Sequence, residues 1–183
     1  IFNPPVEPPA IMPSIYGPPV RPLRGKDIPG MASLRVRDLF PDIPPTILQD
    51  RQDGAPMRRA TLDALAHVDM DMIKPNHRVH VICSEHGFGI DGGFPYANML
   101  GAIREEIVSR TGCQNVKLVV IAWHGRKEPD EFIEYYGLDD MYNGKTVSAN
   151  PLDTGIKIDT VLGPLYGIRA IYNADWIIHT HYD

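Results

Sequence analysis

The chain has 183 residues, of which 43% are hydrophobic and 22% are charged, and its net charge is −5 at pH 7. This length suits one core, or one domain with an extended arm, and the negative charge argues against a nucleic-acid partner. No apolar run approaches the roughly 18 residues of a membrane-spanning helix, so we expect no membrane association.

The first segment, residues 1–50, is predicted to be a proline-rich extended arm. It holds 12 of the 18 prolines, and proline lacks a backbone donor and interrupts regular structure. Only "ASLRVRDLF" (32–40) alternates well enough to predict a strand. The arm also carries apolar residues, which favours packing over the rest of the protein or over a second subunit of a homo-oligomer. These are Ile1, Phe2, Ile11, Met12, Ile15 and Tyr16.

Residues 51–183 alternate between helical and strand patterns. Helices are predicted at 56–69, at "PYANMLGAIREEIVSRTG" (95–112), at "EPDEFIEYYG" (128–137) and near 161–173. The second helix has an apolar stripe and a possible C-cap at Gly112, and Gly137 is expected to stop the third. Strands are predicted at "KPNHRVHVIC" (74–83), "NVKLVVIAW" (115–123), "KTVSAN" (145–150) and "DWIIHTH" (175–181). The order favours an α/β domain with a doubly wound, mostly parallel sheet and helices on both faces.

Polar residues follow three of these strands. The first strand ends in Ser84, Glu85 and His86, the second in His124 and Arg126, and the last in His179 and His181. Right-handed crossovers bring the carboxyl ends of parallel strands to one edge, where ligands bind in such folds. We therefore predict a site at that edge, although strand-end loops are also polar for other reasons.

A glycine-rich segment after the first strand fits G-x-G-x-x-G at Gly87, Gly89 and Gly92. Dinucleotide binding also requires an acid at the end of the next strand, where this chain has Trp123 and His124. Dinucleotide binding is therefore disfavoured. The glycines, with Gly93, are instead expected to form a loop whose backbone amides bind a substrate or an anion, together with Ser84, Glu85, His86 and Arg126.

Two other features concern metals and thiols. His179 and His181 lie two apart in a strand pattern, so both can face one metal ion, as in metal-dependent hydrolases. Cys83 and Cys113 lack any zinc-finger spacing and are predicted to be free, partly buried thiols in a reducing, cytoplasmic compartment. The start at Ile1 and the abrupt end indicate part of a longer polypeptide.

The order of segments over residues 56–183 resembles the N-terminal domain of the nickel-dependent lactate racemase family. The matching stretches are "VHVICSEHGFGIDGGFP", "VVIAWHGRKEPDEFIEYYG" and "NADWIIHTHYD". They stand where the family has a strand with an Asp-x-Thr-Arg-Pro loop, a strand ending in Ala-Thr-Gly-x-His-Arg, and a strand leading to Pro-His-Phe/Tyr. The resemblance rests on spacing and order more than on identical motifs.

The resemblance implies that His124 and His181 are an acid/base pair on opposite sides of a hydroxy-bearing carbon. Histidine titrates close enough to neutral pH for that role. It also implies a nickel-pincer nucleotide that accepts the hydride, attached through residues beyond Asp183, in a C-terminal half that would be a partner of this domain. The first loop lacks the family's arginine, so a substrate other than lactate is expected, with Arg126 as a possible anion-binding group.

Three hypotheses follow from the sequence. The first is a lactate-racemase-like racemase or epimerase of a small 2-hydroxy acid or related polyol. The second is a divalent-metal hydrolase that uses His86, His179 and His181. The third is a non-catalytic subunit that assembles through its proline-rich arm.

Overall fold

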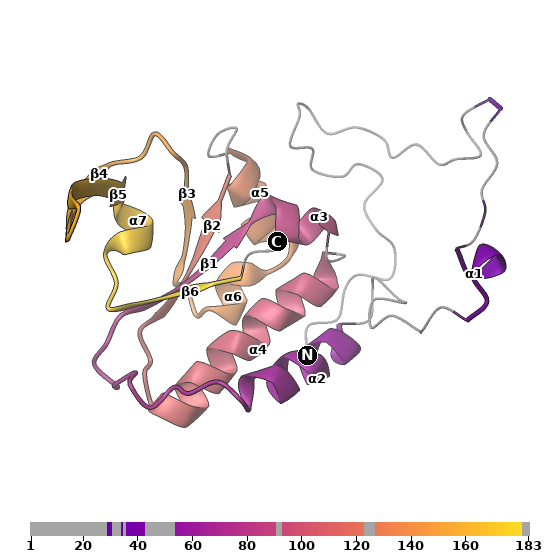
Figure 1. Ribbon diagram of the computed structural model, residues 1–183, viewed down its shortest axis with the longest axis horizontal. Helices are drawn as coiled ribbons and strands as arrows, with labels where there is room; N and C mark the ends of the chain where they lie inside the picture. The colour runs from indigo at the N-terminus through magenta and orange to yellow at the C-terminus, as the bar shows by residue number, and fades with distance from the viewer. Residues whose placement is uncertain are drawn as a thin grey trace.

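A computed structural model of the chain describes residues 29–30, 34, 36–42, 54–90, 93–122 and 127–180 (Figure 1). Its centre is a four-stranded sheet with the order β3-β2-β1-β6, in which every pair of neighbours is parallel. The strands are β1 (Val79–Ser84), β2 (Val116–Ile121), β3 (Thr146–Ala149) and β6 (Trp176–His179). The predicted α/β fold with a mostly parallel sheet is therefore confirmed.

The first face of the sheet carries most of the helices. These are α2 (Ala55–Leu65), α3 (Glu85–Ile90), α4 (Phe94–Thr111), α5 (Lys127–Tyr135) and α6 (Leu138–Met141), with α2 packed against α4. Alternate strand residues enter this core because successive side chains of a strand point to opposite faces. The strand residues on this side are Val79, Val81, Cys83, Val116, Leu118 and Val120.

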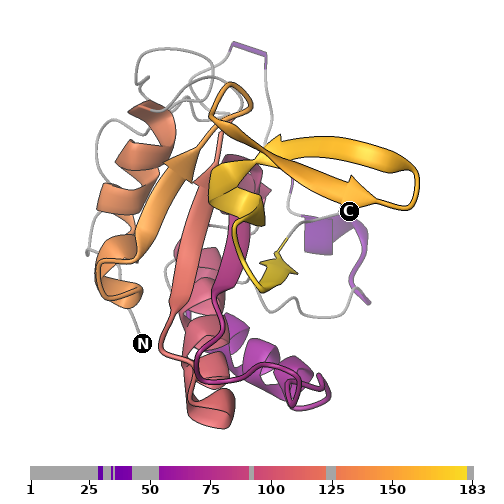
Figure 2. The ribbon, with the colours of Figure 1, turned by 90° about the vertical axis from the view of Figure 1, so that its left-hand side faces the viewer.

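The second face is covered by α7 (Arg169–Tyr172) alone among the helices that the structure describes. Ile171 of α7 packs with Ile82, Val119 and Ala149 in a smaller apolar cluster. The buried His80 ring places Nδ1 2.9 Å from the Ile171 carbonyl oxygen, and this contact fixes α7 to β1. Figure 2 shows α7 in front of the sheet and α4 behind it. The expected helices on both faces are present, but very unequally.

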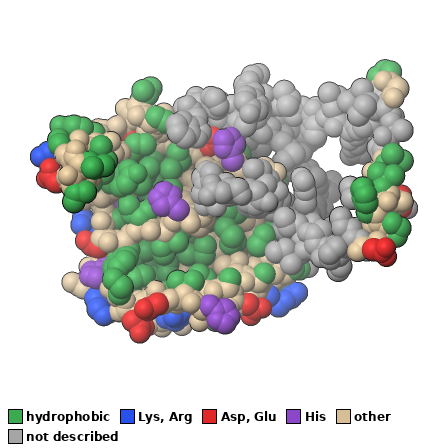
Figure 3. Space-filling model, viewed as in Figure 1, with side chains coloured by type: hydrophobic (Ala, Val, Ile, Leu, Met, Phe, Trp, Pro, Cys, Tyr) green, Lys and Arg blue, Asp and Glu red, His purple; other side chains and the backbone are tan. Residues whose placement is uncertain are grey.

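A two-stranded antiparallel hairpin, β4 (Gly155–Thr160) and β5 (Gly163–Ile168), projects beyond the sheet (Figures 1 and 2). Its turn consists of Val161 and Leu162, whose exposed fractions are 102% and 94%. No charged residue occurs from Thr160 to Ile168. In Figure 3 the hairpin lies at the upper left, where hydrophobic side chains face the solvent.

Several predicted elements differ from the structure. The 161–173 stretch is not mainly a helix, because Gly163, Pro164 and Gly167 disfavour one, and it forms β5 and the single turn α7. The predicted strand at 32–40 is wrong in its described part, where Val36–Leu39 form the short helix α1. A strand needs a hydrogen-bonded neighbour, whereas a helical turn bonds within itself. The first helix of the domain ends at Leu65, four residues earlier than predicted.

The two cysteines are free and buried, as predicted. Burial, and after it the nearby Glu85, raises the pKa of the Cys83 thiol far above its ordinary value. Among the described helices, none is long and apolar enough to cross a membrane. The proline-rich segment lies mostly outside the described residues, and so do the predictions made for it.

Candidate functional site

The strand order creates a switch point between β1 and β6 at their carboxyl ends (Figure 1). From β1 the chain passes along the first face through α4 to β2 on one side. It reaches β6, on the other side of β1, from the second face through α7. In open α/β sheets ligands bind in the crevice outside the strand ends at such a point. The candidate site is therefore the edge formed by the ends of β2, β1 and β6.

The end of β1 brings three of the predicted residues to this edge. Ser84, the last residue of β1, is half-buried and lies in register with Ile121 of β2. Glu85 opens α3 and is only 2% exposed, and no described residue forms a hydrogen bond with either of its carboxyl oxygens. His86 is exposed. Buried polar oxygens usually have a hydrogen-bond partner, so Glu85 stands out among the residues of this edge.

The glycine-rich segment is helical where a loop was predicted. Residues 85–90 form α3, and a β-carbon on Gly87 would lie 2.3 Å from the nearest ring carbon of Tyr96. Gly93, with φ of 71°, precedes α4, and a β-carbon there would lie 2.8 Å from Tyr136 Oη. A β-carbon on Gly89 would have no atom of the described residues within 4 Å, apart from those of its chain neighbours and its own helix backbone. Gly92 lies outside the described residues. Two of the glycines are therefore explained by close packing against tyrosine rings, which removes the G-x-G-x-x-G spacing as evidence for a phosphate loop.

The end of β6 brings His179 and Thr180 to the same edge. His179 is exposed and lies in register with Ile82 of β1. Thr180 is bonded to β1 twice, because its N–H and its hydroxyl both donate to the Ile82 carbonyl, at 3.0 and 2.8 Å. The hydroxyl of Tyr96, on the first turn of α4, donates to the Thr180 carbonyl at 2.7 Å. The first residue after β6 is thus held by two elements.

The remaining predicted residues lie outside the described part of the chain. These are His124, Arg126 and His181. The chain is described up to Ala122, two residues before His124. Ala122 is buried, and its N–H donates to the Ala149 carbonyl at 3.1 Å. His124 follows β2 and His181 follows β6 in the sequence, and both strands end at the candidate edge.

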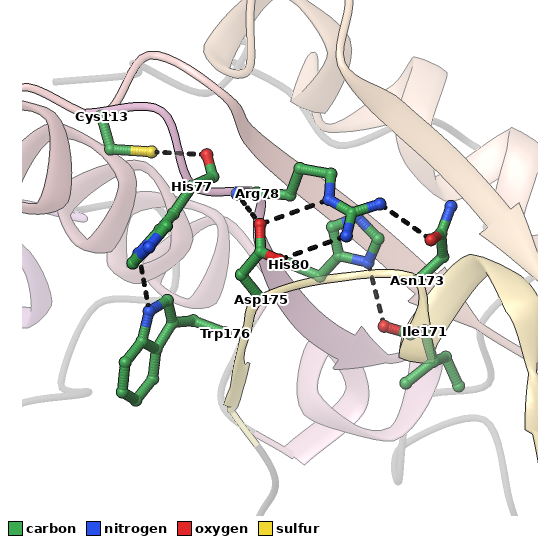
Figure 4. A network of polar contacts seen from close by, with 8 residues as sticks. All are labelled: His77, Arg78, His80, Cys113, Ile171, Asn173, Asp175 and Trp176. Carbon is green, nitrogen blue, oxygen red and sulfur yellow. Dashed lines mark hydrogen bonds and ion pairs between the residues drawn. The ribbon is translucent and has the colours of Figure 1, made fainter. Parts of the chain in front are cut away.

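The opposite edge of the sheet holds a polar network that the sequence did not suggest (Figure 4). Arg78, just before β1, binds the Asp175 carboxylate through its backbone N–H at 2.7 Å and through its guanidinium at 3.2 and 3.3 Å. Its Nη1 also donates to Asn173 Oδ1 at 2.8 Å. Hydrogen bonding from Arg78 lowers the pKa of Asp175 to about 2. These contacts join the starts of β1 and β6, at the end of the sheet opposite to the candidate site.

A groove of about 560 Å³ lies between α5, α6 and the edge strand β3. Its lining includes four acidic residues, Asp130, Glu134, Asp139 and Asp140, and none of the predicted site residues. In the part of the chain that the structure describes, no group of three or more His, Cys, Asp and Glu side chains could hold a metal ion. The predicted metal pair includes His181, which lies outside the described residues.

Tyr96 and Thr180 were not among the residues predicted from the sequence. In the sequence, Thr180 is only the residue between two histidines, and Tyr96 is only one residue of the helix predicted at 95–112. Only the three-dimensional contact between the two marks them as residues of the candidate site.

In the comparisons with known proteins, no family model, no curated protein and no solved structure matches this chain.

Proposed function

We propose that the chain is the α/β domain of a racemase or epimerase that acts on a 2-hydroxy acid or a related polyol. In this proposal His124 and His181 are the acid/base pair, as the resemblance to the nickel-dependent lactate racemase family implies. The small-molecule substrate would lie over the carboxyl end of β1. A cytoplasmic location and a C-terminal half of the same protein belong to the same proposal.

The observation that supports it is the order β2-β1-β6. Two strand spacings separate β2 from β6, which is roughly 9.6 Å. The residues that follow these two strands therefore start on either side of the end of β1. In the proposed reaction one base takes the hydroxyl proton from one enantiomer and a second base, on the other side of the carbon, takes it from the other enantiomer. A site with one histidine after each flanking strand meets this need without any large movement of the sheet.

The end of β1 favours one class of substrate. Among the described residues no donor reaches either buried carboxyl oxygen of Glu85, and a carboxylate there would repel an anion at close range. Hydroxyl groups would satisfy these oxygens. Ser84 and His86 add a half-buried hydroxyl and an exposed imidazole beside it. These residues favour a polyhydroxylated substrate, with any anionic group directed toward Arg126.

The resemblance also implies a nickel-pincer nucleotide, which when bound accepts and returns the hydride of the substrate carbon. The described residues offer no group of three metal-ligating side chains, so no nickel ligand is assigned to them. The steps assigned to this chain are the transfer of the substrate hydroxyl proton to one histidine and the donation of a proton by the other. Histidine can do both near neutral pH.

The test is enantiomer interconversion by the full-length protein purified from its native cells. The protein is incubated with single enantiomers of 2-hydroxy acids and polyols, and the products are separated by chiral chromatography. We expect interconversion in the wild type. We expect His124→Ala and His181→Ala each to lower kcat by about 100-fold or more, because each removes a general acid/base.

The matched control is His67→Ala, since His67 is exposed in the turn after α2, before β1 begins. This variant should retain the wild-type rate. Metal analysis of the same preparation should find nickel, whereas zinc or manganese would favour the hydrolase hypothesis. Wild-type rates in both His124→Ala and His181→Ala would rule out the proposed mechanism.

A further inference from the structure

We infer that Tyr96 is a positioning residue for His181: it fixes the backbone that carries this histidine and couples it to α3. The inference rests on the proposed acid/base role of His181. It starts from the contacts of Thr180, whose carbonyl belongs to the peptide bond that joins it to His181. That carbonyl accepts a hydrogen bond of 2.7 Å from the Tyr96 hydroxyl.

Three oxygen–oxygen contacts form a short chain at this point. Tyr96 Oη lies 2.7 Å from Thr180 O and 2.9 Å from Thr180 Oγ1, and Thr180 Oγ1 lies 2.8 Å from Ile82 O. The two hydroxyls supply two protons for these contacts. When the threonine proton goes to Ile82 O or to Tyr96 Oη, the tyrosine proton remains available to Thr180 O. The carbonyl before His181 is therefore oriented by α4 while the threonine itself is bonded to β1.

Tyr96 is itself rigidly placed. It is 1% exposed, and its ring meets the Phe88 ring edge-on with the centroids 4.9 Å apart. The α-carbon of Gly87 lies so close to the ring that a β-carbon there would approach it to 2.3 Å. Both neighbours belong to α3, which begins with Glu85. Tyr96 therefore connects α3, which follows β1, with Thr180, which follows β6.

This arrangement matters for a reaction that uses His181. A base must lie within hydrogen-bonding reach of the proton that it removes, and a displacement of 1 Å can lower the rate about 100-fold. A free turn after β6 would leave His181 with many backbone conformations. Holding the Thr180 carbonyl removes part of that freedom before the substrate binds, because it fixes Thr180 relative to β1 and α4.

The experiment compares Tyr96→Phe with Tyr142→Phe in the full-length protein. Tyr142 is a matched control, because it is fully buried and its hydroxyl donates to a backbone carbonyl, Leu100 O, at 2.8 Å. We expect Tyr96→Phe to lower kcat for interconversion about tenfold or more, with KM within about twofold of the wild type. Tyr142→Phe should leave both constants within about twofold.

Two threonine variants separate the contact of the Tyr96 hydroxyl with the Thr180 carbonyl from the contacts of the threonine hydroxyl. Thr180→Val removes the threonine hydroxyl but leaves the tyrosine proton to the Thr180 carbonyl, so we expect it to lower kcat less than Tyr96→Phe does. Thr180→Ser keeps the hydroxyl and should retain the wild-type kcat. Equal kcat in Tyr96→Phe and Tyr142→Phe, or a loss in Thr180→Val as large as that in Tyr96→Phe, would overturn the inference.

Amide hydrogen exchange supplies a readout that does not depend on turnover. In Tyr96→Phe the Thr180 amide should exchange about tenfold faster or more than in Tyr142→Phe, after correction for global stability. If the wild type interconverts no enantiomers, the proposed function fails, and this measurement alone tests whether Tyr96 holds Thr180 in place. Faster exchange at Thr180 in Tyr96→Phe than in Tyr142→Phe would then support that role of Tyr96. Equal exchange in the two variants would reject it.

Discussion

At the scale of single residues, the structure separates acidic groups that hold the fold from acidic groups that take no visible part in it. Asp175 is of the first kind, because its two oxygens accept three hydrogen bonds from Arg78. Glu85 is of the second kind, because both of its oxygens are buried and no described residue donates to them. Both acids stand beside β1, one at each end. The sequence alone gives no sign of this difference.

Asp175 gives a prediction for the pH dependence of stability. Hydrogen bonding from Arg78 lowers its pKa in the folded protein from the ordinary value of 3.8 to about 2. A carboxyl whose pKa is lowered by folding stabilises the native state above the unfolded pKa and loses that effect as the pH falls through the folded pKa. Asp175→Asn should therefore lower the melting temperature at pH 7, and its difference from the wild type should shrink between about pH 4 and pH 2.

Thermal unfolding followed by circular dichroism at pH 7, 4, 3 and 2 measures this difference. Asp63→Asn, on the exposed surface of α2, controls for the loss of one negative charge and should follow the wild type. A constant difference between wild type and Asp175→Asn over the whole range would show that the ion pair does not contribute through ionisation.

At the scale of elements, α3 shows how a glycine-rich stretch can be a packing device. Gly87 and Gly89 lie two residues apart in the same short helix, yet a β-carbon would meet the Tyr96 ring at the first and open space at the second. A motif match treats these glycines alike. Their environments assign them different roles, which only the placement of α4 reveals.

The pair gives a direct prediction. Gly87→Ala should lower the free energy of unfolding by about 1–3 kcal/mol, because the tyrosine ring or α3 must move. Gly89→Ala should raise it by about 0.5–1 kcal/mol, since alanine loses less backbone entropy than glycine in a helix. Urea unfolding of both variants measures the two changes. Equal effects would contradict the packing of α3 against Tyr96.

At the scale of the whole molecule, hydrophobic periodicity predicted the parallel sheet because each of its strands is a short apolar run. β1 reads VHVICS and β2 reads VKLVVI, and both are buried along nearly their whole length. The hairpin could not be predicted this way. Its first strand, GIKIDT, alternates, but its second strand, GPLYGI, is mostly exposed and has no alternation, and that half of the hairpin was predicted to be a helix.

The candidate site was predictable only in part. That polar residues follow the strands can be read from the sequence, and the parallel topology then brings Ser84 and His179 to one edge. The burial of Glu85 and the bond between Tyr96 and Thr180 depend on long-range packing across about 80 residues of chain, which no local pattern records. The segment after the first strand was therefore wrongly predicted to be an open loop, whereas residues 85–90 form the helix α3.

The strands differ in how many hydrogen-bonded neighbours they have, and this difference predicts unequal local stability. β1 has a hydrogen-bonded neighbour on each side, whereas β4 and β5 pair only with each other among the described strands. A two-stranded hairpin is marginal by itself. We expect amides of β1 such as Val81 to exchange at least about 100-fold more slowly than amides of β5 such as Leu165. Exchange measured by mass spectrometry or NMR tests this, and similar protection in both would contradict it.

The projecting turn at Val161 and Leu162 also has a consequence for lengthening the chain. Neither side chain has any cover, so inserted residues there would displace no packed group. Closing a loop of twice the length costs only about 0.6 kcal/mol. A peptide tag or a small fluorescent label inserted between these two residues would therefore leave the sheet and its candidate edge intact, and it would mark the molecule without changing the termini.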